Sequence, residues 1–208
     1  MTITAKHIQR SNIIVTYPDN SLPLPEASQM FALYPGDISK GSIFSDTPSL
    51  MTRIFEFPSI GVQWIFEPSR IRIEDRMIRQ PGDSKLAHEL LRVLEVLYLN
   101  MHPSAYGFNY DIIYRVNPII PTREIMESFV DSASLEDIKD FGWQYTLAKD
   151  KGRRTETYFF KAVSPIEYSI HANFHFNETT LPSNTELQAA FEKKYISTDD
   201  SLLHMSFS

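Results

Sequence analysis

The longest regular pattern in the chain is an unbroken alternation of apolar and polar residues over residues 166–177, IEYSIHANFHFN. Successive side chains of a β-strand point to opposite faces, so this pattern predicts a strand with one face in the core and the other in solvent. The polar face carries His171, Asn173 and His175, and its only charged residue is Glu167. This face is therefore a candidate binding surface.

The same period of two recurs in shorter segments along the chain. Short turns such as Glu67-Pro68-Ser69 and Asp150-Lys151-Gly152 separate neighbouring segments, which is typical of antiparallel hairpins. The remaining predicted strands cover 11–17, 53–57, 60–66, 70–77, 105–116, 143–149, 155–163 and 202–207.

Apolar residues at a spacing of three and four predict an amphipathic helix over 84–99. Thr122 begins a short helix through Val130, and the pair Ser183 and Glu186 forms a capping box for a helix to Tyr195. The segment 18–50 is rich in proline and is predicted to be irregular. The fold class that follows is α+β: a mainly antiparallel sheet with two to four helices packed on one side.

The order of predicted elements is the same over 53–116 and 143–207. Each half has three strands, a proline-marked break, a helix and a further strand. This order suggests an internal duplication of a β-β-β-α-β unit within a single globular domain of residues 1–208.

Composition narrows the class of protein. The chain has 208 residues, of which 42% are hydrophobic, so it can bury a core. The net charge of −6 argues against nucleic-acid or anionic-membrane binding by the whole surface. The absence of cysteine excludes disulfides, thiolate metal sites and a cysteine nucleophile. With no signal-like or membrane-spanning run, we expect a cytoplasmic protein that does not contact membrane.

Chemical motifs are lacking. The sequence has no phosphate-binding glycine loop, no GxSxG elbow and no HExxH helix. His171 and His175 share a face of their strand but lie about 13 Å apart, too far to bind one metal ion. We therefore assign no catalytic residue, metal site or cofactor, and we interpret His171, Asn173 and His175 as candidate ligand-binding residues only.

The most basic stretch of the chain, 149–154, lies at a predicted hairpin tip. Lys151, Arg153 and Arg154 are candidates for contact with an acidic partner or with phosphate. Charged hairpin tips are also common for solubility alone, so this stretch does not by itself predict nucleic-acid binding.

The segment 117–130, NPIIPTREIMESFV, follows a predicted strand and resembles the proline-to-helix segment of SecB-type export chaperones. That resemblance implies a cytoplasmic, oligomeric, antiparallel-sheet protein that binds unfolded chains in apolar grooves. It covers about a dozen residues, and the helix over 84–99 departs from the order of elements in that family. The two-half layout also resembles a sporadically distributed bacterial family of unknown function.

Three hypotheses for function follow. The first is a non-enzymatic binding or assembly protein that acts through sheet faces or edges, as a homo-oligomer. The second is an enzyme or small-ligand binder that uses the polar face of 166–177. The third is contact with nucleic acid or an acidic partner through the basic hairpin at 149–154.

Overall fold

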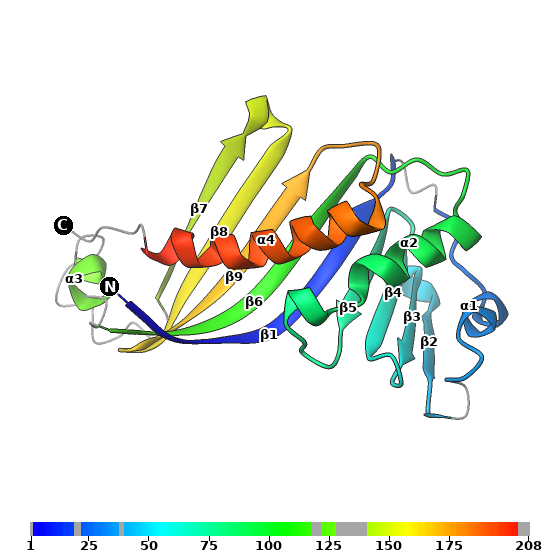
Figure 1. The fold of residues 1–208 in the computed structure, drawn as a ribbon, viewed down its shortest axis with the longest axis horizontal. Helices are drawn as coiled ribbons and strands as arrows, with labels where there is room; N and C mark the ends of the chain where they lie inside the picture. Colours follow the sequence, from blue (N-terminus) through cyan, green and yellow to red (C-terminus); the bar gives the residue numbers. More distant parts are fainter. Residues whose placement is uncertain (1, 19–21, 38–39, 118–121, 128–140, 204–208) are drawn as a thin grey trace.

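The computed structural model describes the chain except for residues 1, 19–21, 38–39, 118–121, 128–140 and 204–208. It confirms the predicted class: the protein is α+β, and the described residues form one nine-stranded antiparallel sheet and four α-helices. The helices α2 and α4 cross one face of the sheet (Figure 1). The sequence pattern thus predicted both the type of sheet and the one-sided helix packing.

The strand order in the sheet is β2-β3-β4-β5-β1-β6-β9-β8-β7. The central strands β1 and β6 are antiparallel and pair along their own lengths, from Thr2 opposite Asn117 to Thr16 opposite Ala105. The strands are β1 (Thr2–Thr16), β2 (Ile43–Thr47), β3 (Thr52–Phe57), β4 (Val62–Glu67), β5 (Arg70–Asp75), β6 (Ala105–Asn117), β7 (Gly142–Lys149), β8 (Arg154–Ser164) and β9 (Glu167–Phe176).

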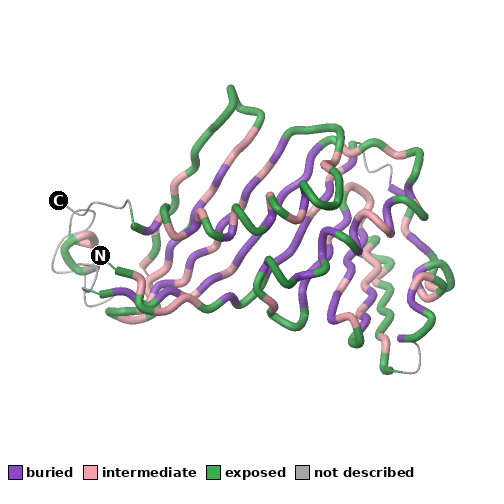
Figure 2. Tube along the Cα trace, in the orientation of Figure 1, coloured by how far each residue is buried: buried purple, intermediate pink, exposed green. Residues whose placement is uncertain are grey.

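The core lies between the sheet and the helices. Along β9 the alternation predicted from the sequence is present: Tyr168, Ile170, Ala172 and Phe174 are fully buried, and the residues between them are partly exposed. In Figure 2 the buried residues concentrate in the middle strands of the sheet.

The helices are α1 (Ala27–Leu33), α2 (Leu86–Leu97), α3 (Thr122–Glu127) and α4 (Asn184–Leu203), and 3₁₀ turns occur at Pro48–Leu50, Pro81–Asp83 and Asp150–Gly152.

The C-terminal helix extends further than the sequence indicated. It was predicted to end near Tyr195, but α4 continues through Asp199 and Asp200 to Leu203. The hydroxyl of Tyr114 donates to Asp199 (2.7 Å), and Lys6 pairs with the same carboxylate (2.7 Å). These long-range contacts hold the acidic residues in a helix. The predicted strand 202–207 is therefore wrong at residues 202 and 203, and its remainder lies outside the described residues.

Two N-terminal predictions also needed correction. The strand predicted at 11–17 begins at Thr2, because β1 pairs with β6 along its whole length. The segment 18–50, predicted to be irregular, contains α1, β2 and a 3₁₀ turn. Met30 of α1 is fully buried, and the ring of Phe31 packs edge-on against Phe55. The proline-rich segment thus covers the sheet's own core.

The order of elements repeats along the chain. A long strand, a meander of strands and a helix occur as β1, β2–β5 and α2, and again as β6, β7–β9 and α4. The first meander has one strand more than the described part of the second, because it includes β2. In the sheet, β1 lies beside β5, and β6 lies beside β9. A duplication that begins at β1 and at β6 fits this order, and duplication itself remains a prediction.

Candidate functional site

The predicted binding residues of β9 lie on the sheet face opposite the buried aromatic residues. His171, Asn173 and His175 alternate with Ala172 and Phe174, so their side chains point away from the helices. Each has different partners on β6 and β8. These partners decide whether the three side chains form one site.

Asn173 belongs to a row of amides that crosses three strands. Its Nδ2 donates to Oδ1 of Asn109 (2.5 Å), and Nδ2 of Asn109 donates to Oδ1 of Asn12 (2.9 Å). Asn12 and Asn109 are buried. Buried amides need partners, and here they supply them to one another. Asn173 therefore ties β9 to β6.

His171 belongs to a separate row of charged groups. Its Nδ1 lies 2.5 Å from Oδ1 of Asp111, whose other oxygen lies 2.6 Å from Arg10. Burial raises the pKa of Asp111, but the hydrogen bond from His171 and the charges of His171 and Arg10 outweigh burial and lower it. Phe159 is the residue opposite His171 on β8. An Asp–His pair can hold a catalytic base in position, but Phe159, the residue opposite His171, offers no nucleophile.

His175 has a third set of neighbours. Its Nε2 lies 2.8 Å from Oδ1 of Asn177, and the residues opposite it are Gly107 on β6 and Thr155 on β8. Its partners thus differ from those of His171 and Asn173. In the described part of the chain, no group of three metal-ligating side chains comes together. The polar face is a set of separate rows, and the predicted ligand-binding role of these residues stays a prediction.

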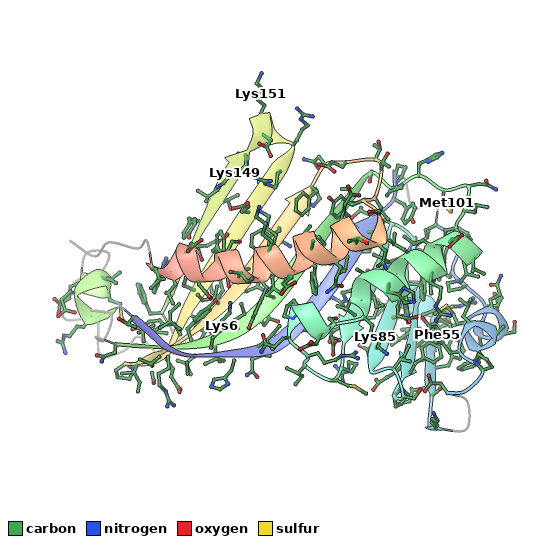
Figure 3. The ribbon with its side chains drawn as sticks, in the orientation of Figure 1. Lys6, Phe55, Lys85, Met101, Lys149 and Lys151 are labelled. Atoms are coloured by element: carbon green, nitrogen blue, oxygen red, sulfur yellow. The ribbon has the colours of Figure 1, made fainter. Side chains whose placement is uncertain are left out.

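The basic stretch does not form one patch. Lys151 and Arg153 are exposed at the tip of the β7–β8 hairpin; Figure 3 labels Lys151 at the tip and Lys149 below it, beside β7. Lys151 adopts a left-handed backbone conformation with φ of 56°. Arg154 instead lies on the helix-facing side, 3.5 Å from Asp150 and 3.4 Å from Glu156. The predicted partner-contact residues therefore divide between the tip and the inner side of the hairpin.

Arg154 lines a cleft of about 490 Å³ between the hairpin and α4. Glu156 is buried there, with Lys194 of α4 2.6 Å from its carboxylate and Lys149 3.7 Å away. Burial raises the pKa of Glu156, but Lys194, Lys149 and Arg154 outweigh it and lower the pKa. This cluster was not among the predicted site residues. Its signal was a glutamate on the apolar face of β8, in alternation with Tyr158 and Phe160.

The outer edge of β7 is a second feature of the hairpin. Among the described residues the sheet order ends at β7, and most residues of this strand are exposed (Figure 2). The N–H of Ala162 donates to the carbonyl of Phe141 (3.2 Å), so Phe141 faces β8. Backbone groups alternate in direction along a strand, so the N–H and C=O groups on alternate residues point away from β8. These outward residues are Gly142, Gln144, Thr146 and Ala148.

Comparison of the sequence with protein families and with curated proteins identifies no relative. A scan against protein-family models finds no match, and a search of curated proteins also finds none. Among the described residues, no helix is long and apolar enough to cross a membrane.

Proposed function

We propose that this protein is a non-enzymatic assembly protein whose copies join through the outer edge of β7. The observation that carries this proposal is the composition of that edge. From Gly142 to Ala148 the strand has no charged residue and no proline, and its pairing with β8 has no bulge. Edge strands are usually protected by charges, prolines or bulges, because their free backbone groups pair readily with another strand.

The opposite edge of the sheet shows this protection. The strand β2 has five residues, and one of them is Asp46, which pairs with Arg53 (3.2 Å). A short edge with a charged residue offers few backbone groups to a partner. The two ends of one sheet thus differ in the feature that controls strand pairing.

A second copy of β7 is the partner that fits this edge. An antiparallel pair centred on Tyr145 places Gln144 opposite Thr146 and Gly142 opposite Ala148 of the second copy, so all outward backbone groups find partners. On the helix-facing side, the same register places Trp143 opposite Leu147, which is 40% exposed in the single chain. The basic tips with Lys151 then lie at opposite ends, which avoids charge repulsion.

The pairing energy can be bounded. The outward residues form four pairs across a two-fold axis, and each pair exchanges two bonds, which gives about eight backbone hydrogen bonds. At about 1 kcal/mol net for each bond, the sum is about 8 kcal/mol. Association costs at least about 4 kcal/mol in lost translation and rotation. We therefore expect a weak, concentration-dependent dimer.

Light scattering after size-exclusion chromatography and sedimentation velocity test the proposal. The wild-type mass should rise toward a dimer as the protein concentration approaches about 1 mM, where a binding free energy of about 4 kcal/mol becomes visible. Thr146→Pro removes an outward N–H without breaking a backbone hydrogen bond to β8, and it should give a monomer. It also removes the hydroxyl contact between Thr146 and Thr157 of β8 (3.1 Å), which the matched variant below removes as well. The matched variant Thr146→Val keeps that N–H and should still dimerise. Monomeric wild-type protein throughout this range would overturn the proposal.

A further inference from the structure

The cleft between the β7–β8 hairpin and α4 brings together three cations from three elements. Lys149 comes from the end of β7, Arg154 from the start of β8 and Lys194 from α4. All three face the single buried carboxylate of Glu156. Residues distant in sequence thus converge on one hollow.

The three cations differ in how firmly they are held. The ammonium of Lys194 lies 2.6 Å from Glu156, and the side chain of Lys194 is 16% exposed. The ammonium of Lys149 lies 3.7 Å away, beyond hydrogen-bond distance, and its side chain is 43% exposed. The Nε of Arg154 lies 3.4 Å away. Glu156 and Lys194 therefore form the tight pair, while Lys149 and Arg154 keep donor capacity for another acceptor.

The lining of the cleft offers cationic donors to an anion. It holds Lys149, Arg154 and Lys194 against Glu156 and the exposed Asp200, and Asp150, outside the lining, lies 3.5 Å from Arg154. Arg154 is thus shared between Glu156 and Asp150, and the more exposed Lys149 is the cation with the most donor capacity for a further acceptor. The neutral donors are already used: the hydroxyls of Ser197 and Ser201 donate to carbonyls of α4 (2.9 and 2.6 Å).

We propose that this cleft binds a small organic oxyanion. Its phosphate or carboxylate group lies between Lys149 and Arg154, and its apolar part lies against Tyr145 and Leu147 in the cleft wall. A hollow of about 490 Å³ is in the size range of small-molecule sites, and it exceeds what an inorganic ion fills. Charge-assisted hydrogen bonds to ammonium and guanidinium groups supply the recognition of the oxyanion.

Isothermal titration calorimetry with phenyl phosphate and with benzoate, at constant ionic strength, tests this site. We expect saturable binding with one ligand for each chain. Lys149→Met should weaken it about tenfold, and Lys149→Arg should restore most of it, because one charge-assisted contact is lost and then replaced. Lys193→Met is the matched control, since Lys193 is exposed on α4 outside the cleft lining, and binding should not change. Tighter binding of one probe identifies the preferred oxyanion.

Two results would overturn the proposal. One is the absence of saturable binding of both probes to the wild-type protein. The other is an equal loss of affinity in Lys149→Met and Lys193→Met, which would indicate attraction by overall charge. The Thr146→Pro variant keeps every cation of the cleft, so it should still bind phenyl phosphate as a monomer. Ligand binding and self-assembly are therefore separable.

Discussion

Replacing Glu156 by glutamine should destabilise the protein, because the cations that Glu156 neutralises would lose their negatively charged partner. The side chain of Glu156 is 7% exposed and that of Lys194 is 16% exposed. Removing one partner of a buried ion pair typically costs about 3–5 kcal/mol. Lys149 and Arg154 are partly exposed and add little, because water screens them. Since Lys194 also retains some contact with solvent, we expect a loss of about 2–3 kcal/mol in the free energy of unfolding at pH 7.

The loss of stability in Glu156→Gln should depend on pH, because Glu156 titrates. The pKa of Glu156 is lowered in the folded protein, so the folded state binds the proton less readily than the unfolded chain does. Its contribution to stability is then complete above the unfolded pKa of about 4.3 and is lost as the pH falls through the folded pKa. The difference between wild type and Glu156→Gln should therefore be large at pH 7 and should shrink below about pH 4.

Urea unfolding followed by circular dichroism, at pH 7 and in steps down to pH 3, measures both effects. Glu95→Gln is the matched control, because Glu95 is exposed on α2, and its loss should stay within about 0.5 kcal/mol. Two results would refute the reasoning: a loss below about 0.5 kcal/mol in Glu156→Gln at pH 7, or a loss of equal size at pH 7 and pH 3.

Two further predictions concern the sheet face and α4. Asn109→Ala should lower the free energy of unfolding by about 1–3 kcal/mol, because it leaves the amides of Asn12 and Asn173 without their partner. Urea unfolding measures this loss, and a loss no larger than that of the exposed control Gln144→Ala would contradict the prediction. Lys6→Met should speed hydrogen exchange in the last turns of α4, because the Lys6 ammonium contacts both Asp199 (2.7 Å) and the carbonyl of Tyr195 (2.9 Å). Unchanged exchange there would show that these contacts do not hold the helix end.

The buried and exposed faces of strands and helices could be predicted from the sequence, because side-chain direction is a local property. The alternation along β9 sets which residues are buried and which, such as His171 and His175, point away from the helices. The three-and-four spacing in α2 likewise places Leu86, Leu90 and Val93 in the core. These predictions needed no knowledge of which strands are neighbours.

The candidate surfaces depended on neighbours that the sequence does not reveal. Arg10 and Asp111 face His171 only because β1 and β9 both flank β6. The capping box at Ser183 was visible in the sequence, but the length of α4 was not, since its end is held by Lys6 at the other end of the chain. The alternation along β8 marked Glu156 as a polar residue on an apolar face, but it gave no sign of the cations that converge on it.

The sequence by itself determined the class of fold, the buried face of most of the strands that it predicted and the start of the main helices. Only the tertiary structure decided which strand lies at the edge, which charges converge on Glu156, and how the polar residues of β9 divide among separate rows. The physical reason is that side-chain periodicity is set by the backbone of one element. Pairing partners, by contrast, are set by hydrogen bonds between backbones, which look alike at every residue, and by packing over the whole core.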